Sequence, residues 1–245
     1  MSYLTGFHAI EERLKAGNVR GVLLVAKPGP RARELIRLAL DHKVRVDRVG
    51  THDLNRIAWD NRGVALELED GDSPPGAAAS LEDYLAGLAG RGGAADALVA
   101  VLDAITDPHN YGAVLRSCDQ FAVDLVLCRN RRIAKHADSV AKTSAGAAAW
   151  VPVVEVPNLP RAVKDLKDAG FWIYGADMRG EAAYTRNLRG RVALIFGGEG
   201  TGISRLLREA CDGLVSIPTK GRVDSLNVSV AAGVLFYEVL RQRRE

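Results

Sequence analysis

Three short segments of the chain gather amides, a carboxylate, a hydroxyl and a guanidinium among glycines, and these side chains could do chemistry. They are residues 103–116 with Asn110 and Arg116, residues 196–202 with Gly197, Gly198 and Glu199, and residues 217–229 with Ser225 and Asn227. Each predicts a strand-loop-helix turn, where a ligand can approach bare backbone amides. The second and third loops follow successive strands, which predicts a binding crevice.

The glycine loop at 197–202 matches neither of two common phosphate-binding patterns. A P-loop requires Gly-Lys-Ser/Thr, whereas Gly202 is followed by Ile203 and Ser204. A dinucleotide fingerprint requires G-x-G-x-x-G after the first strand of a domain, whereas this loop reads G-x-G-x-G and follows about the fifth. Taken alone, the loop could also be a tight turn without a ligand.

The elements that must position these loops alternate between apolar strands and helices. The expected strands are residues 98–102, 125–128, 153–156, 171–176, 192–196 and 214–217, and helices are expected from about residue 203 and over 226–242. Such alternation predicts a parallel sheet with helices on both faces. We expect this domain to span residues 96–245.

The first part of the chain predicts a separate small α/β domain at residues 1–69. Its expected helices are 8–16 and 31–42, and its expected strands are 19–26, 44–49 and 64–68. Residues 70–95 are rich in glycine, proline and alanine around a short helical stretch near 81–88, which predicts a linker.

Composition excludes several classes of protein. At 245 residues, 47% hydrophobic and 26% charged, the chain is typical of a soluble globular protein. It has no apolar run long enough to cross a bilayer and no signal-like segment before Glu11, so we expect a cytoplasmic protein without a membrane partner. The three cysteines are isolated, which indicates neither disulfides nor a metal site. His109 and His136 are interpreted as exposed loop histidines without a role.

The three motifs, in this order, resemble the SpoU (TrmH) family of RNA ribose 2'-O-methyltransferases. The match covers roughly residues 97–243 and rests on Asn110, Gly112, Arg116, Gly197, Glu199, Gly200, Ser225, Leu226 and Asn227. The opening Gly6-Phe7-His8-Ala9-Ile10-Glu11 also looks like the L30e-like substrate-binding domain of many members. The resemblance implies a trefoil-knotted parallel-sheet (SPOUT) catalytic domain, a homodimer, and a guanosine of 23S rRNA as target.

The same resemblance implies roles for single residues. S-adenosyl-L-methionine is held mainly by backbone, which here implicates Gly197, Gly198, Ile217, Ser225, Leu226 and Asn227. Asn110, Glu199 and Asn227 supply polar side chains to the catalytic crevice, and Ser144 approaches the RNA. By itself Asn110 would be interpreted as the N-cap of the following helix.

Arg116 is the residue that the resemblance marks as catalytic. A guanidinium stays protonated at ordinary pH, so its fork suits a phosphate and a polarised hydroxyl better than it suits proton removal. By itself Arg116 would be interpreted as a surface arginine paired with Asp119 or Gln120.

Charge is distributed unevenly although the net charge is only +3. Between Arg13 and Arg48 there are ten basic residues against three acidic ones, and a second basic cluster is Arg129, Arg131, Arg132 and Lys135. Alone these would be solvated surfaces; beside the methyltransferase motifs they favour RNA contact.

Two other functions stay open. One is methylation of tRNA or of another rRNA ribose, and Ala149 and Trp150 stand where many ribosomal members carry a glutamate. The other is a non-catalytic RNA-binding or ribosome-assembly protein that kept the fold.

Overall fold

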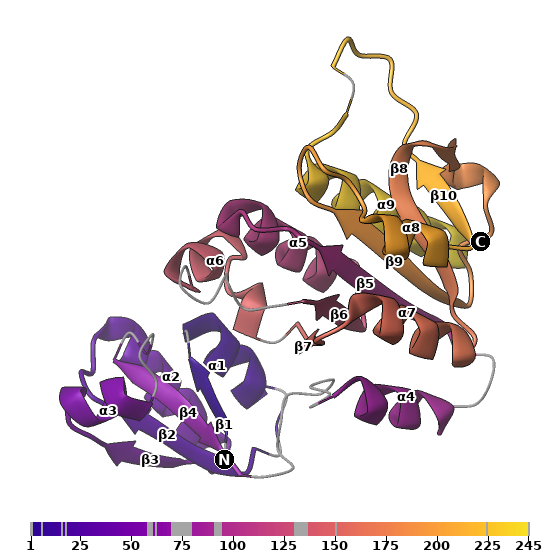
Figure 1. Cartoon of the computed structure of the whole chain (residues 1–245). Helices are drawn as coiled ribbons and strands as arrows, with labels where there is room; N and C mark the ends of the chain where they lie inside the picture. The colour runs from indigo at the N-terminus through magenta and orange to yellow at the C-terminus, as the bar shows by residue number, and fades with distance from the viewer. Residues whose placement is uncertain are drawn as a thin grey trace. The chain divides into compact units, whose positions relative to one another are not determined.

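The computed structural model describes residues 2–5, 7–15, 17, 19–57, 61, 63–69, 80–90, 95–129, 137–149, 151–223 and 225–244. The chain divides into two compact units, Met1–Ala77 and Ala78–Glu245 (Figure 1). His136 and most of the second basic cluster, namely Arg131, Arg132 and Lys135, lie outside the described residues.

Unit 1 is a four-stranded sheet with helices. Its elements are β1 (Ser2–Thr5), α1 (Phe7–Lys15), β2 (Gly21–Val25), α2 (Pro30–Asp41), β3 (Arg45–Arg48), α3 (Thr51–Ile57) and β4 (Val64–Leu68). The strand order is β1-β4-β2-β3, with β4 antiparallel to β1 and β2, and β2 parallel to β3. The α2 helix buries Ala32, Leu35 and Ala39 and leaves its other side exposed. Sequence patterns anticipated neither β1 nor α3. The β1 strand is only four residues long, which is too short for a clear alternating pattern. The α3 helix contributes Leu54 as its buried hydrophobic residue, which gives no helical spacing of apolar residues.

Unit 2 is a six-stranded sheet in which all neighbouring strands are parallel. The strand order is β10-β8-β9-β5-β6-β7. Its elements are α4 (Leu81–Ala89), β5 (Ala97–Asp103), α5 (Pro108–Gln120), β6 (Leu125–Cys128), α6 (Ala137–Thr143), η2 (Ala147–Ala149), β7 (Val153–Glu155), α7 (Leu159–Asp168), β8 (Trp172–Ala182), η3 (Ala183–Thr185), β9 (Arg191–Gly197), α8 (Arg205–Ala210), β10 (Gly213–Ser216) and α9 (Val228–Arg244).

Helices cover both faces of this sheet, as the sequence predicted. Along β5, Leu98, Ala100 and Leu102 pack in one cluster with residues of α5 and α9. The alternate residues Val99 and Val101 pack in a second cluster with residues of α4, α7 and α8. Because side chains of a strand alternate between faces, a strand that is buried on both sides reads as the continuous apolar run seen here.

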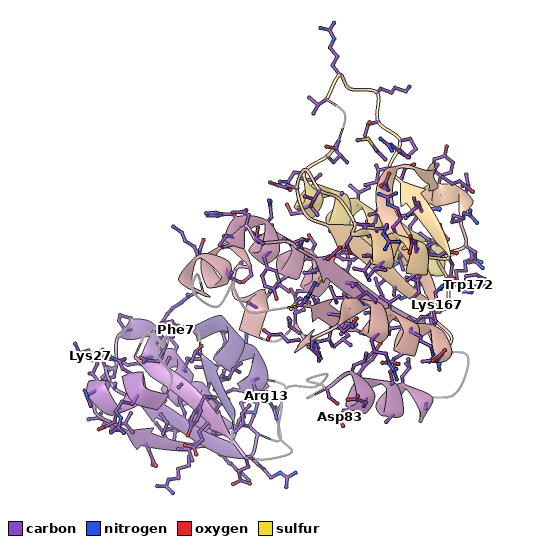
Figure 2. The ribbon with its side chains drawn as sticks, viewed as in Figure 1. Phe7, Arg13, Lys27, Asp83, Lys167 and Trp172 are labelled. Atoms are coloured by element: carbon purple, nitrogen blue, oxygen red, sulfur yellow. The ribbon has the colours of Figure 1, made fainter. Side chains whose placement is uncertain are left out.

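Two elements differ from their expected bounds. The α4 helix falls inside the segment expected to be a linker, yet Leu81 and Leu88 are buried in the core of unit 2. Its N-cap Ser80 accepts a hydrogen bond at 3.1 Å from the backbone amide of Asp83, a residue that is labelled in Figure 2. The β8 strand continues to Ala182 because β10 pairs first with Tyr174 and Gly175 and, after a register shift, with Glu181 and Ala182. A side chain at Gly180 would lie 2.5 Å from the Leu214 backbone.

Candidate active site

Two of the predicted loops leave the sheet side by side. The adjacent strands β5 and β9 stay in register to their ends, where Asp103 pairs with Gly197. The Asp103 carboxylate also accepts a hydrogen bond from the Ser204 amide at 2.8 Å. This bond ties the glycine loop to the end of β5, so the first and second motifs lie at one edge of the sheet.

Asn110, Glu199 and Asn227 form one hydrogen-bonded group, here called the polar triad. Asn110 Nδ2 donates to Glu199 Oε1 at 2.6 Å. Asn227 Nδ2 donates to Asn110 Oδ1 at 2.9 Å and is 3.1 Å from Glu199 Oε1. Each of the three motifs contributes one residue, so the triad fixes the relative positions of all three loops.

The orientations of the two amides follow from their other partners. Asn227 Oδ1 accepts hydrogen bonds from the Ser229 amide at 2.9 Å and the Ser229 hydroxyl at 2.6 Å, which turns Nδ2 toward Asn110. Asn110 is not the N-cap of α5, the role that its context favoured. That residue is Asp107, whose Oδ2 accepts from the Asn110 amide at 2.8 Å. The Asn110 side chain is therefore free to join the triad.

The glycines of the second motif let the loop close on itself. A Cβ on Gly197 would lie 2.1 Å from the Gly202 carbonyl carbon, and one on Gly198 would lie 2.6 Å from the Ala104 carbonyl oxygen. Gly200 and Gly202 adopt φ angles of +78° and +64°, which favour glycine. The backbone contacts that require Gly197 and Gly198 are thus made inside the protein, and no ligand is needed to explain these glycines.

The connection from β10 to α9 offers free backbone groups and apolar side chains. Residues 218–223 make no hydrogen bond to any described residue. Ile217 packs against the sheet core, while Leu226 is 39% exposed and Ser225 is exposed. The segment extends beyond the ends of both elements, and its side chains stand clear of the rest of the unit (Figures 1 and 2). Free amides and carbonyls next to the apolar Ile217 and Leu226 have the chemistry to hold the adenosyl group that the sequence resemblance implies.

An open groove of about 660 Å³ runs between α5 and α9. Its lining includes Arg116 and Ser117 on α5, Ser229 and Gly233 on α9, and Thr143 at the end of α6. Arg116 is exposed and makes no hydrogen bond or ion pair within the described residues, and Gln120 donates instead to Asp119 at 2.9 Å. The guanidinium thus keeps all its donors for a ligand in the groove.

Ser144 is buried behind the groove surface. It is 1% exposed, and its hydroxyl accepts from the Ala148 amide at 3.3 Å. The preceding residue, Thr143, lines the groove. Thr143 ends α6 and Ser144 follows it. The α6 helix packs so closely on α5 that a Cβ at Gly112 would lie 2.9 Å from the Thr143 Cβ. The structure therefore gives Ser144 a part in the turn that follows α6 and does not place it at the groove surface.

His109 is the residue near the site that the sequence analysis left without a role. Its Nδ1 lies 3.3 Å from Thr143 Oγ1. Its position was available from the sequence, because His109 and Arg116 are seven residues apart and therefore share one side of α5. The sequence analysis gave His109 no role because its hydrogen-bonding partner, Thr143, comes from another helix, α6.

Unit 1 carries the basic side chains that the sequence pointed to. Some are occupied: Arg13 donates to the Gly17 carbonyl at 2.9 Å, Lys15 pairs with Glu11 at 2.8 Å and Arg45 pairs with Asp47 at 2.7 Å. Others are exposed and unpaired within the described part of unit 1, namely Lys27, Arg31, Arg33, Arg37, Lys43 and Arg48. Lys27 is labelled in Figure 2.

The described ranges contain neither a metal-binding cluster nor a membrane-spanning helix. No group of three histidine, cysteine, aspartate or glutamate side chains there could hold a metal ion. No helix there is both long and apolar enough to span a membrane.

The fold and the site define a two-unit α/β protein whose three motif loops meet at the carboxyl ends of parallel strands. The chain belongs to the SpoU rRNA Methylase family, whose family model matches residues 97–237. A second family model, described as RNA 2'-O ribose methyltransferase substrate binding, matches residues 3–71.

Similar proteins cover nearly the whole chain. It is 41% identical over 245 residues to the 23S rRNA (guanosine-2'-O-)-methyltransferase RlmB of Xanthomonas axonopodis pv. citri, covering 98% of this chain and 96% of that protein. It is 39% identical over 244 residues to the RlmB protein of Neisseria meningitidis serogroup B, covering 97% and 94%.

Solved structures show the same fold. An RNA 2'-O ribose methyltransferase has a TM-score of 0.65 and 26% identity, covering 99% of this chain and 89% of that one. The SpoU methyltransferase AviRb from Streptomyces viridochromogenes in complex with AdoMet has a TM-score of 0.69 and 23% identity, covering 99% and 90%.

Proposed function

We propose that the protein uses S-adenosyl-L-methionine to methylate the ribose 2'-hydroxyl of a guanosine in 23S rRNA. The polar triad carries the proposal, because it joins one residue of each family motif at the edge of the sheet. The RlmB relatives, similar along almost their whole length, support the choice of substrate.

The cofactor is expected between the glycine loop and the connection that follows β10. S-adenosyl-L-methionine supplies a methyl group activated by its sulfonium. Free backbone groups of residues 218–223, with Ile217 and Leu226 as apolar neighbours, would hold the adenosyl part. Gly197, Gly198 and Ser225 shape the same pocket. The triad holds these loops in place before the ligand arrives, which reduces the ordering cost of binding.

Arg116 is expected to grip the RNA. Its unpaired guanidinium lies in the groove between α5 and α9 and offers five donors in a fixed plane. A phosphate next to the target ribose would satisfy them and would place the 2'-hydroxyl. Ser144 is not needed for this contact, because its hydroxyl already serves the turn after α6.

Unit 1 is expected to deliver the RNA. Its unpaired basic side chains would contact phosphates, an attraction that does not depend on sequence and weakens with salt. The match to a substrate-binding family over residues 3–71 supports this role. We place the protein with its RNA in the cytoplasm.

A homodimer and the trefoil knot are part of the same proposal. Val230, Val234 and Tyr237 are 52%, 41% and 55% exposed along α9, which is more apolar surface than a monomer needs there. These three residues also line the groove that holds Arg116, so a partner subunit would form one wall of that groove. We expect a dimer through this face in light scattering at micromolar concentration. A monomer mass would contradict it.

The function is tested by mapping modified nucleosides in RNA from a deletion strain and from the complemented strain. We expect one 2'-O-methylguanosine of 23S rRNA to disappear on deletion and to return with the wild-type gene. Loss of a tRNA methyl group instead would support the tRNA alternative. An unchanged methylation map, with no heat of binding for S-adenosyl-L-methionine in calorimetry, would support a non-catalytic RNA-binding protein.

A further inference from the structure

His109 and Arg116 border the same strip of α5. Seven residues advance a helix by about 700°, so the two side chains point within about 20° of each other and lie about 10 Å apart along the axis. Helical side chains lean toward the N-terminus, so Arg116 extends toward His109. Ala113 lies between them and lines the groove. Its small side chain leaves room for a ligand that contacts both residues.

Thr143 determines which nitrogen of His109 carries the proton. The Thr143 hydroxyl has one hydrogen, and it is donated to the Ser139 carbonyl at 2.8 Å. Thr143 Oγ1 has no second hydrogen for His109 Nδ1, which lies 3.3 Å away. The oxygen must therefore accept in this contact, and Nδ1 donates. In the neutral ring this leaves the lone pair on Nε2. Because Gly112 keeps α6 close to α5, the contact is built into the packing of the two helices.

We propose that His109 is the proton acceptor for the ribose 2'-hydroxyl. This inference rests on the proposed function. Nε2 forms a bond to the hydroxyl proton while the 2'-oxygen forms a bond to the methyl carbon and the carbon–sulfur bond breaks. The positive charge of the sulfonium is lost, the imidazole gains one, and the ring later releases its proton to water.

Other candidates near the groove are less suited to take the proton. Arg116 stays protonated, and Glu199 accepts hydrogen bonds from both asparagines of the triad. Burial raises the pKa of Tyr111 and of Cys118, which face the core from the same helix. His109 is an exposed imidazole on the side of α5 that bears Arg116, and it is the described histidine of unit 2.

Charged side chains face His109 from several elements. On its own helix these are the cap Asp107 and Arg116, and α6 contributes the exposed Lys142 beside Thr143. Glu199 lies beyond Asn110 in the triad. The pH profile of each variant is therefore compared with that of the wild-type protein and not with a free imidazole.

The first experiment measures the tautomer directly, without RNA or cofactor. In ¹⁵N NMR spectra of the full chain above the titration of His109, we expect Nδ1 to carry the proton. Thr143→Val removes the acceptor and should give a mixture of tautomers, whereas Thr143→Ser should keep the wild-type form. An Nε2-protonated ring in the wild-type protein would overturn the proposal.

The second experiment is single-turnover methylation with saturating RNA and S-adenosyl-L-methionine from about pH 5.5 to 9. We expect the wild-type rate to rise with pH as His109 loses its proton. His109→Asn should reduce the rate at least about a hundredfold and remove this rise. Cofactor and RNA affinities should stay within about threefold. His52→Asn, which changes an exposed histidine of unit 1, is the matched control.

The outcomes separate two failures. If the wild-type protein methylates RNA and His109→Asn does so within about threefold with the same pH profile, the proton acceptor is another group. If the wild-type protein methylates no RNA, the proposed function itself fails and the proposal falls with it.

Discussion

Removing the Glu199 carboxylate should weaken cofactor binding by an amount that follows from the triad. Glu199 Oε1 accepts from Asn110 at 2.6 Å and from Asn227 at 3.1 Å, so Glu199→Ala deletes two hydrogen bonds that order three loops. A hydrogen bond contributes about 0.5 to 1.5 kcal/mol net, and exposure of these groups favours the lower half of that range. We therefore expect a total loss of about 1 to 2 kcal/mol.

That loss corresponds to a dissociation constant for S-adenosyl-L-methionine that rises about 5- to 30-fold, measured by isothermal titration calorimetry. Glu199→Gln keeps an oxygen acceptor and should cost about threefold or less. Glu209→Ala is the matched control, because this exposed carboxylate pairs with Arg205 on α8 and lies outside the triad. Circular dichroism should show the native fold in each variant.

A double-mutant cycle between Asn110→Ala and Glu199→Ala tests the cause. If the triad orders the loops, the two changes should be coupled by about 0.5 kcal/mol or more in cofactor binding, since contacting residues are not additive. Additive effects, or unchanged binding in Glu199→Ala, would refute the argument that the triad pre-organises the loops.

Three further outcomes are expected. Arg116→Ala should change the free energy of unfolding by about 0.5 kcal/mol or less, because its side chain is unpaired. The same variant should slow methylation at least about a hundredfold while the cofactor still binds. Near-normal activity would show that Arg116 does not position the RNA. Gly197→Ala should abolish cofactor binding by opening the loop, since its Cβ would lie 2.1 Å from backbone, whereas Gly200→Ala, with no atom within 4 Å, should cost about 1 kcal/mol of left-handed strain. Arg33→Gln with Arg37→Gln should reduce the slope of log K for RNA binding against log salt concentration by about 1.5, measured by filter binding. An unchanged slope would show that α2 does not contact the RNA.

Sequence patterns predicted the strands of unit 2 well because most are buried on both faces and are bounded by glycine and polar residues. They also singled out the three loops that the polar triad joins, because polar side chains that follow buried strands have few structural uses. The hydrogen bonds of the triad were not predictable, since they depend on which strands are neighbours in the sheet. Asp107 as the cap of α5 was predictable in principle, because an aspartate followed by Pro108 is a frequent helix start.

The extent of the linker between the units could not be read from composition. A stretch rich in glycine and alanine hides α4, whose apolar residues Leu81, Tyr84, Leu85 and Leu88 follow a helical spacing. Whether such a helix belongs to a linker or to a core depends on the surface that it can cover, which only the folded sheet provides. A truncation that begins after α4 would therefore remove part of the core of unit 2.

The α5 helix points its side chains in several directions, and this limits how the gene can change. Asn110 faces the triad, Gly112 faces α6, Val114 faces the sheet and Arg116 faces the groove. Inserting or deleting a single codon between positions 110 and 116 would turn Arg116 by about 100° away from the groove while Asn110 kept its place. Related genes can therefore differ in the lengths of their surface loops. The number of residues between Asn110 and Arg116 should be the same in all of them.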